Sequence, residues 1–331
     1  MQRLTEPVGA IDFGGTHLRT AVVVEGRVIG RQHGPSAAAS GARQAVEAAV
    51  ASLQSSLKEH AAGGGRPPVA VGVSAPGPLD PFAGVLLDPP NLHRSFHDFS
   101  LADALTERLG MPVYLDRDTQ VAALGEGAFG AAIGLSDYVY VTVSTGIGGA
   151  VVIDGRLLRG ARGLAGEIGH LQVELDGPPC GCGARGHLEA MSSGTGISRT
   201  AMEALAGGAG RGSALAEAAR RVAPRPVSAA EVAAAEEAGD ELAAEVMEVA
   251  RRAFAAAMVS VVDVFAPQRV VVGGGVAIGQ GERLLGPARE AVARYAFREQ
   301  ARQVEIVPAA LGDDVGLLGA AVLVEERLRD A

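Results

Sequence analysis

Two nine-residue segments of the 331-residue chain are identical at five positions and similar at the other four, and this repeat constrains the fold more than any other feature. Residues 21–29 read AVVVEGRVI, and residues 150–158 read AVVIDGRLL. Each segment follows a glycine-rich loop, DFGGTHLRT in the first copy and STGIGG in the second. Glu-Gly and Asp-Gly between β-branched runs are typical of hairpin turns. Because turn, flanks and preceding loop all match, we prefer duplication to chance similarity, and we expect two lobes built from one unit.

The rest of the chain alternates between helical and strand-like stretches, which predicts an α/β fold. Before the second copy, helices are expected over 37–61, 101–109 and 119–129, and strands over 69–74 and 113–115. After it, several helices are expected within 194–239, one long helix over 241–265, a strand over 270–272 and a final helix over 316–329.

The composition argues against several classes of protein. The net charge is −9 and aromatic residues make up 4% with no Trp, so we expect no nucleic-acid partner and no base-stacking surface. No uncharged apolar stretch reaches the ~18–20 residues of a membrane-spanning helix. The N-terminus is unlike a signal peptide, so we expect a cytoplasmic protein with no membrane partner. The two cysteines are too few for a secreted disulfide framework.

Three glycine-rich loops are candidates for binding phosphate groups. The first contains Asp12, Gly14, Gly15 and Thr16, and the second contains Ser144, Thr145 and Gly146. Glycines let backbone N–H groups approach an anion closely, Asp12 can hold a hydrated Mg²⁺, and Thr16 can donate to a phosphate. The third loop, Gly273, Gly274 and Gly275, follows a predicted strand but is not a P-loop, because no GK[ST] follows. A plain hairpin turn is the structural alternative for the first loop.

Six motifs occur in the order DFGGT, DTQVAALGE, STGIGG, GLAGEIGH, CGCGARGHLE and VVVGGG. In these motifs, over nearly its whole length, the chain resembles the ROK family (repressor, open reading frame, kinase) of bacterial sugar kinases and sugar-responsive regulators. The resemblance implies the actin-like ATPase (ribonuclease H-like) fold, a duplicated α/β fold of two lobes with a central cleft for ATP and sugar. We expect a smaller lobe of residues 1–117 plus 315–331. Residues 118–314 are expected to form a larger lobe with a zinc loop and a helical region.

The resemblance implies that Asp118 is the catalytic base. We expect Asp118 to be the N-cap of the helix over 119–129, where the helix dipole favours an ionised carboxylate. Such a carboxylate can accept the proton of a sugar hydroxyl as its oxygen attacks the γ-phosphate of ATP. Asp116 is the competing carboxylate, which fits less well because it is expected at the end of a strand. A helix cap without chemistry is the structural alternative.

The resemblance also implies the sugar contacts. Glu167 and His170 match the family's sugar-binding pair, Glu189 matches a third contact and Asn91 a fourth. These side chains can hydrogen-bond ring hydroxyls, and such contacts discriminate between sugars. One position departs from the family, since Arg117 stands where Asn is common. Arg117 can reach a hydroxyl, select an acidic or modified sugar, or point away, and Asp116 beside it can neutralise its charge.

The resemblance finally implies a structural zinc ion, which the family holds with one His and three Cys. In Cys180-Gly181-Cys182-Gly183-Ala184-Arg185-Gly186-His187 the third Cys is replaced by His187. Together with His170 this leaves two Cys and two His, an acceptable tetrahedral zinc shell. A degenerate loop without metal is the alternative. A disulfide between Cys180 and Cys182 is not expected, because the Cys-x-Cys ring is strained.

The resemblance as a whole implies an ATP-dependent hexose kinase that uses Mg·ATP, most simply a glucokinase, and a homodimer. Kinases for N-acetylmannosamine, another N-acetylhexosamine, an amino-glucose or fructose are alternatives, because Arg117 leaves the sugar open. A sugar-binding regulator without catalysis is the alternative of another class. Regulators of the family carry an added N-terminal helix-turn-helix, and none is expected here because the first phosphate strand begins near residue 8.

Overall fold

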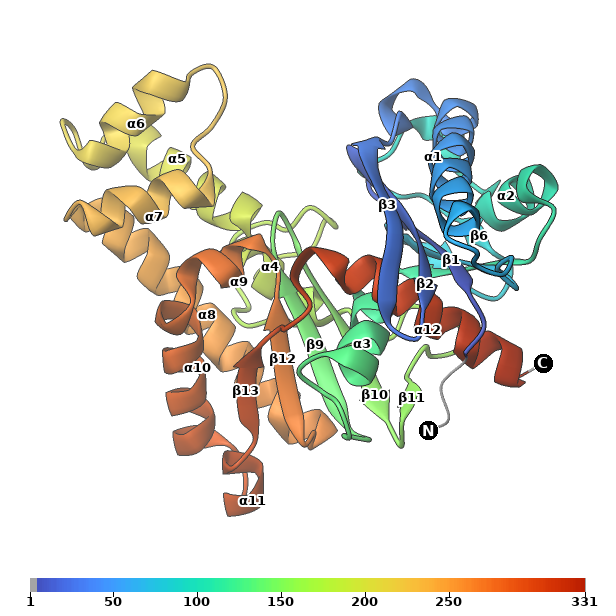
Figure 1. Ribbon diagram of the computed structural model, residues 1–331. Coiled ribbons are helices and arrows are strands. Elements are labelled where there is room, and N and C mark those ends of the chain that lie inside the picture. Colours follow the sequence, from blue (N-terminus) through green and yellow to red (C-terminus); the bar gives the residue numbers. More distant parts are fainter. Residues whose placement is uncertain (1–4, 331) are drawn as a thin grey trace. The chain divides into compact units, whose positions relative to one another are not determined.

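The computed structural model describes residues 5–330, which form two compact α/β units. The first unit contains the chain up to Gly134, the segment Leu157–Ala165 and the chain from Ala310 on. The second unit contains Leu135–Arg156 and Gly166–Ala309. Each unit is built around its own five-stranded sheet (Figure 1).

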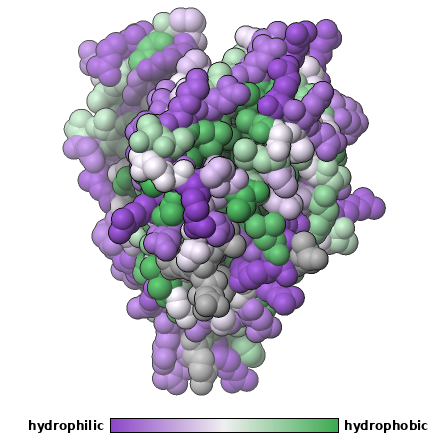
Figure 2. All heavy atoms as spheres, turned by 45° about the vertical axis from the view of Figure 1, so that its right-hand side comes forward, coloured by the Kyte–Doolittle hydropathy of each residue, from purple (hydrophilic) through white to green (hydrophobic). Residues whose placement is uncertain are grey.

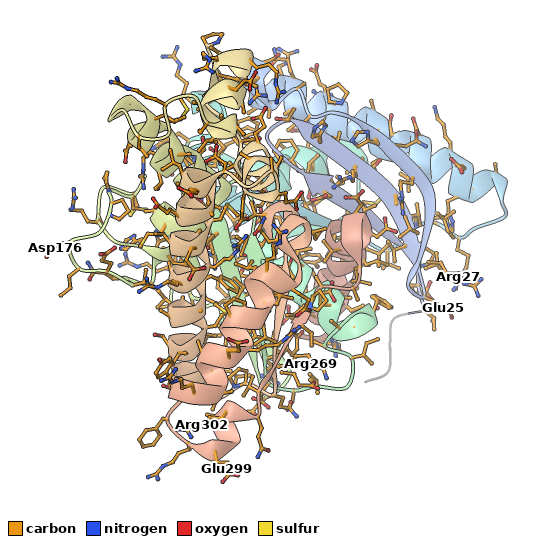
Figure 3. The ribbon with its side chains drawn as sticks, turned by 90° about the vertical axis from the view of Figure 1, so that its left-hand side faces the viewer. Glu25, Arg27, Asp176, Arg269, Glu299 and Arg302 are labelled. Atoms are coloured by element: carbon orange, nitrogen blue, oxygen red, sulfur yellow. The ribbon has the colours of Figure 1, made fainter. Side chains whose placement is uncertain are left out.

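The first sheet has the strand order β3-β2-β1-β4-β8. Strands β1 (Val8–Phe13), β2 (His17–Val24) and β3 (Arg27–Pro35) are antiparallel neighbours, and β4 (Val71–Ala75) and β8 (Val113–Arg117) extend the sheet in parallel with β1. Glu25 and Gly26 join β2 to β3 with φ angles of 49° and 77°, as a tight hairpin requires. Figure 3 shows Glu25 and Arg27 at the tip of this hairpin.

The second sheet repeats this plan with the order β11-β10-β9-β12-β13. Strands β9 (Tyr138–Val143), β10 (Ile147–Ile153) and β11 (Arg156–Leu157) follow one another, and β12 (Arg269–Gly273) and β13 (Glu305–Pro308) run parallel to β9. The β10–β11 turn contains Asp154 and Gly155, with φ angles of 51° and 73°. Since strand order and turn conformation both repeat, the predicted duplication is confirmed.

Helices cover both faces of the first sheet (Figure 1). Helices α1 (Ala42–Ala62) and α2 (Leu101–Leu109) pack on the face that buries Ile11 and Phe13. Helix α12 (Val315–Asp330) and helix α3 (Asp118–Phe129) pack on the opposite face, which buries Val8 and Ala10. Alternate residues of β1 therefore enter two cores, as the strand period requires.

Short elements complete the first unit. A three-stranded sheet has the order β5-β6-β7, formed by β5 (Leu79–Asp80), β6 (Val85–Leu86) and β7 (Phe99–Ser100). Single 3₁₀ turns occur at Ala38–Ser40, Arg94–Phe96 and Gly312–Asp314. The small sheet was not predicted, because two-residue strands have no periodicity to read.

The second unit is richer in helices. Helices α8 (Glu241–Phe265) and α10 (Glu282–Tyr295) pack on the second sheet around Phe254, Met258 and Val261. Helices α5 (Gly194–Ala206), α6 (Ala214–Val222) and α7 (Ala229–Glu237) form a separate core with the first half of α8. The shorter helices are α4 (Leu188–Ser192), α9 (Gly275–Gln280) and α11 (Glu299–Arg302), with a 3₁₀ turn at Ile168–His170.

The division of the chain differs from the expected boundary at residues 117 and 118. Helix α3 belongs to the first unit, as does the segment Leu157–Ala165. The physical reason is the close packing of α3 on α12: a Cβ at Gly319 would lie 1.9 Å from the carbonyl oxygen of Val121. The C-terminal helix lies in the first unit, and it begins at Val315.

Within residues 5–330, no helix is long and apolar enough to cross a membrane. On the face shown in Figure 2, hydrophilic side chains predominate and apolar ones form small groups between them. This surface fits the charged fraction of 20% and the net charge of −9.

Candidate active site

The first glycine loop joins β1 to β2 and is closed by a hydrogen bond from the Gly14 amide to the His17 carbonyl, 2.9 Å long. Asp12 precedes the loop at the end of β1, and Arg19 opposite it donates through Nη1 to Asp12 Oδ2 over 3.1 Å. The Asp12 carboxylate also lies against the first turn of α12, where a Cβ at Gly316 would be 2.6 Å from its Cγ. A partly exposed carboxylate is thus fixed beside the loop.

Asn91 lies next to this loop. A Cβ at Gly15 would approach the Asn91 carbonyl oxygen to 3.2 Å, and the Asn91 and Thr16 side chains are both exposed. The structure therefore brings Asn91 close to Gly15 and Thr16, although Asn91 lies about 75 positions further along the chain. These residues were predicted from separate motifs.

The second glycine loop joins β9 to β10 and contacts Glu189. The Glu189 carboxylate accepts the Ile147 amide through Oε2 over 2.9 Å, and a Cβ at Gly146 would lie 2.5 Å from the same oxygen. The loop's carbonyls at Ser144 and Thr145 accept amides of the first turn of α5. Glu189, predicted as a sugar contact, is thus also part of the support of the predicted phosphate loop.

The third glycine cluster lies beside the second loop. Strand β12 pairs Gly273 with Thr142 of β9. Gly274 has a φ of 93°, and a Cβ there would lie 2.5 Å from the Val143 carbonyl oxygen, so this position accepts only glycine. Gly275 then begins the short helix α9. The expected turn after a strand is therefore present, and it opens a helix.

A cavity of about 690 Å³ adjoins these two loops within the second unit. Its walls come from both loops, the N-terminus of α5, the segment before α7, α7 itself, α8 and α9. The lining residues are Ser144, Thr145, Gly194, Thr195, Ser198, Arg225, Pro226, Val227, Ser228, Ala229, Ala230, Ala233, Ala234, Glu237, Met247, Gly275, Val276, Gly279 and Gln280. This volume is typical of small-molecule sites.

Sequence reasoning missed most of this cavity. Its largest share comes from residues 225–237, an Ala-rich segment that reads only as helix. An alanine side chain has no functional group, so the sequence does not indicate that this segment lines a cavity. The exception is the Ser228–Glu231 capping box, which marks the start of α7.

Asp118 is the first residue of α3 and is exposed. The expectation that it is the N-cap is wrong, because β8 continues to Arg117 in register with Ala75, and Arg117 occupies the N-cap. Asp118 still lies in the first turn, where the helix dipole favours a negative charge. Its Oδ1 atom accepts the Thr119 amide over 2.7 Å. An exposed, oriented carboxylate of this kind can accept a proton from a bound hydroxyl.

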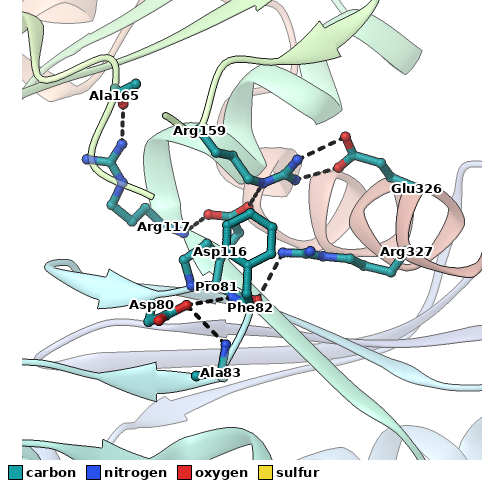
Figure 4. A network of polar contacts seen from close by, with 10 residues as sticks. All are labelled: Asp80, Pro81, Phe82, Ala83, Asp116, Arg117, Arg159, Ala165, Glu326 and Arg327. Carbon is teal, nitrogen blue, oxygen red and sulfur yellow. Dashed lines mark hydrogen bonds and ion pairs between the residues drawn. The ribbon is translucent and has the colours of Figure 1, made fainter. Parts of the chain in front are cut away.

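Asp116 is in a different environment (Figure 4). Its side chain is fully buried, and Oδ2 accepts Arg159 Nε over 2.8 Å, while Arg159 also pairs with Glu326. Burial raises the pKa of Asp116, against the opposing charge and hydrogen bond of Arg159. For Arg159, burial acts downward, but the two carboxylates outweigh it and raise the pKa of the guanidinium. A carboxylate enclosed in this way is not accessible to a substrate.

Arg117 lies in the same network and is buried. Its Nη2 atom donates to the carbonyl oxygen of Ala165, as Figure 4 shows. Its side chain also packs on Gly77, where a Cβ would lie 2.9 Å from Arg117 Cδ. In the orientation that satisfies both neighbours, the Gln120 amide donates to Asp116 and accepts from Arg117 Nη2. The ion-pair partner of Asp116 is Arg159, whereas Asp116 accepts the backbone amide of Arg117 over 2.9 Å.

Glu167 precedes a 3₁₀ turn packed on the start of β10, and His170 is the last residue of that turn. A Cβ at Gly169 would lie 2.0 Å from the Ile147 carbonyl oxygen, and one at Gly166 would lie 3.0 Å from that of Gly149. These close approaches fix the turn against the second glycine loop. Glu167 is exposed, and His170 is partly buried. The second unit thus brings Glu167, His170 and Glu189 around one loop.

The four predicted metal ligands form a cluster. One ligand atom from each of His170, Cys180, Cys182 and His187 lies within 4.8 Å of the others. The distances are 3.2 Å between the two His Nδ1 atoms, 3.3 Å from Cys182 Sγ to His187 Nδ1, and 4.0 Å from Cys180 Sγ to His170 Nδ1. Burial raises the pKa of the Cys180 thiol.

The His170–His187 and Cys182–His187 distances are close to those around a tetrahedral zinc ion, and the Cys180–His170 distance is longer. With Zn–N of about 2.05 Å and Zn–S of about 2.3 Å, the two nitrogens should be about 3.3 Å apart and each N–S pair about 3.5 Å. Both His residues use Nδ1, which leaves each Nε2 atom on the far side of its ring. The loop that carries the cysteines projects from the second unit, with Asp176 at its exposed tip (Figure 3).

Comparisons with known proteins agree with these features. A protein-family model described as the ROK family matches residues 8–327. The glucokinase of Thermotoga maritima is 36% identical over 271 residues, which are 78% of this chain and 80% of that protein. The N-acetylmannosamine kinase of Escherichia coli is 34% identical over 319 residues, which are 96% of this chain and 97% of that protein.

Among solved structures, the ROK hexokinase of Thermus thermophilus has a TM-score of 0.82 and 35% sequence identity, and the match covers 98% of this chain and 100% of that one. The predicted α/β fold of the actin-like ATPase class, with two lobes of duplicated topology, is therefore confirmed.

Proposed function

Because the chain belongs to the ROK family, we propose that it is an ATP-dependent sugar kinase that phosphorylates a hexose, with glucose at its 6-hydroxyl as the first candidate. The observation that carries the proposal is the contrast between two neighbouring carboxylates. Asp118 is exposed at the first turn of a helix, while Asp116 is buried against Arg159. Only Asp118 is accessible to a bound sugar.

In this proposal Asp118 acts as the general base. Its carboxylate accepts the hydroxyl proton of the sugar while the sugar oxygen attacks the γ-phosphate of ATP. The hydrogen bond from the Thr119 amide to Oδ1 helps to orient the carboxylate. General-base assistance of this kind contributes about 10²–10⁴-fold to the rate.

The nucleotide is assigned to the cavity of the second unit. Its Ser144, Thr145 and Gly275 lining comes from the two glycine loops, whose amides suit phosphates. The alanines of α7 and Met247 suit an uncharged ring system. The loop of Gly14, Gly15 and Thr16 is a further phosphate site. Asp12 would contact the hydrated Mg²⁺ of Mg·ATP, since its carboxylate is partly exposed and fixed by Arg19.

The sugar is assigned to Asn91, Glu167, His170 and Glu189. Arg117 influences the sugar through position rather than contact, because its guanidinium is buried and donates to the Ala165 carbonyl two residues before Glu167. N-acetylmannosamine is the second candidate substrate. It is supported by the relative that matches 96% of this chain, against 78% for the glucokinase.

The cluster of His170, Cys180, Cys182 and His187 is assigned to a structural zinc ion, because two thiols and two imidazoles at these distances match its preferences. A bound zinc ion supplies cross-linking of the loop and no Lewis acid for the transfer. It would hold His170 by Nδ1, so that Nε2 is presented to a sugar hydroxyl.

The proposal is tested with Asp118→Asn, which keeps size and the helix position but removes the base. Phosphorylation should fall by ~10²–10⁴-fold while sugar binding survives. Asp103→Asn is the matched control, since Asp103 is also an exposed acid in the first turn of a helix, α2. Near-normal turnover of Asp118→Asn, measured by coupled ADP release, would reject the assignment.

A further inference from the structure

Gln280 stands out among the described residues that line the nucleotide cavity, because it combines a polar side chain with burial. It is 8% exposed and ends helix α9, whereas the two charged residues of the lining, Arg225 and Glu237, are exposed. Arg225 is moreover already paired with both carboxylate oxygens of Glu231. A buried amide in a mainly apolar wall needs partners for its oxygen and its nitrogen.

The oxygen of this amide accepts two hydrogen bonds from Arg251, which is not among the residues that line the cavity. Gln280 Oε1 accepts Arg251 Nε over 3.2 Å and Arg251 Nη2 over 2.6 Å. Because both donors belong to a guanidinium, the identity of oxygen and nitrogen in the amide is fixed. The Nε2 atom therefore carries the two N–H groups that remain, and within residues 5–330 no protein group is recorded as their acceptor.

Arg251 is itself held in place. It is 8% exposed, and its Nη1 and Nη2 atoms donate to the two Glu236 carboxylate oxygens over 2.7 and 2.6 Å. Arg283 adds a longer contact to Glu236 at 3.4 Å. A buried Arg–Glu pair gains little stability over an apolar pair of the same volume. Its fixed geometry does, however, determine the orientation of the Gln280 amide.

We propose that Gln280 is a specificity-determining residue of the nucleotide site, which donates a hydrogen bond from Nε2 to a ring nitrogen of the adenine base, and that Arg251 is its positioning residue. The proposal rests on the function proposed above. It assigns the phosphates to the part of the lining that contains Ser144, Thr145 and Gly275, and the base to the part that contains Gln280, at the other end of α9. Adenine suits this end because its unsubstituted ring nitrogens are acceptors.

Two substitutions separate the donor from the fold. Gln280→Glu keeps an acceptor for Arg251 but has no N–H group, and Gln280→Met keeps the length of the side chain but no hydrogen bond. Losing one neutral hydrogen bond should weaken binding of ADP about 3–10-fold, measured by calorimetry, and should raise KM for ATP by the same factor. KM for the sugar and kcat should stay unchanged. Ile278→Ala is the matched control, because Ile278 is on the same helix, 71% exposed and outside the cavity lining.

The positioning role of Arg251 has its own readout. Arg251→Lys retains the charge but loses the planar fork that fixes the amide, so KM for ATP should rise while KM for the sugar does not. Deaza analogues of ATP, each lacking one ring nitrogen, complete the test. The analogue without the accepting nitrogen should bind the wild type less tightly, and should bind Gln280→Met no less tightly than ATP does.

The outcomes separate this inference from the function on which it rests. If the wild type phosphorylates a sugar with ATP but the Gln280 variants bind ADP as tightly as the wild type, this inference alone is wrong. If KM for the sugar rises as much as KM for ATP, the role of Gln280 is structural, and the inference is also overturned. If the wild type binds neither ADP nor ATP, the proposed function fails and the inference with it.

Discussion

Single side chains divide into those whose role follows from the sequence and those whose role depends on distant partners. Asp118 belongs to the first group, because its motif and the helix that follows it are contiguous. Asp116 belongs to the second. Its ion-pair partner Arg159 is 43 positions away, and Glu326, which also pairs with Arg159, is 210 positions away, and no local pattern connects them. The fold alone shows that one of the two aspartates is enclosed, and that Arg117 is anchored to a backbone carbonyl.

The buried ion pair between Asp116 and Arg159 predicts a loss of stability when Arg159 is replaced. Arg159→Met leaves Asp116 as a buried carboxylate without its ion-pair partner, which should cost about 3–5 kcal/mol of unfolding free energy. Denaturant unfolding measures this cost. Exposed Arg162→Met, on the same segment, is the control and should be within about 0.5 kcal/mol of the wild type. A stability of Arg159→Met equal to that of the control would contradict the network described.

The ion pair between Arg225, which lines the cavity, and Glu231 predicts that the stability of the protein depends on pH. Hydrogen bonds from Arg225, then the Ser228 amide, lower the pKa of Glu231 from 4.5 to about 2. Because the folded-state pKa is below the unfolded one, this contribution to stability is complete above pH 4.5 and is lost as the pH falls toward 2. Glu231→Gln should therefore lower Tm at pH 7, and the difference from the wild type should shrink between pH 4.5 and 3. Exposed Glu245→Gln is the control. A difference that does not change with pH would show that the carboxylate charge is not responsible.

At the scale of elements, the sequence repeat predicted the two sheets well. Strand–loop–strand–turn–strand is local, and both copies carry turn residues that hold a positive φ. The ranges 101–109 and 241–265 match α2 and α8, while the helix expected from residue 37 begins at Ala42. What the sequence did not indicate is where helices pack. The placement of α3 and α12 against each other depends on glycines whose role appears only in three dimensions.

A pair of glycines tests this packing. At Gly319 a Cβ would lie 1.9 Å from the Val121 carbonyl oxygen, whereas at Gly286 in α10 it would meet nothing within 4 Å. Gly319→Ala should therefore destabilise the protein by at least about 1–3 kcal/mol, and Gly286→Ala, whose Cβ meets only the neighbouring Pro287, should change its stability by less than about 1 kcal/mol. Thermal unfolding of both variants decides the matter. Equal effects would contradict the close approach of α3 and α12.

The metal loop gives a second test at this scale. His187→Cys restores a ligand that zinc accepts, so we expect one zinc ion per chain, as in the wild type. His187→Ala should lose most of the metal and lower Tm, because a structural zinc ion contributes directly to folding. Arg185→Ala, an exposed neighbour, is the control. Metal content is read by plasma mass spectrometry, and a wild type that contains no zinc after growth with zinc would reject the assignment.

At the scale of the whole molecule, the family motifs and the structure both indicate a sugar kinase, but they draw attention to different residues. The motifs indicate the residues that we propose to contact phosphate, sugar or metal, because those residues are chemically distinctive. The cavity beside the second glycine loop is lined by residues from four helices, among them the alanines of α7 and Met247 of α8, and tertiary packing alone brings them together. For the same reason the pairing of Gln280 with Arg251 was not predictable.

The proposed kinase activity and its sugar are properties of the whole molecule. They are measured by coupled ADP release from zinc-loaded protein with Mg·ATP, over a panel of glucose, N-acetylmannosamine, N-acetylglucosamine, glucosamine and fructose. We expect sugar-dependent release for at least one hexose, highest for glucose, and its loss by ~10²–10⁴-fold in Asp118→Asn. No sugar-dependent release with any member of the panel would contradict the kinase and favour a sugar-binding regulator.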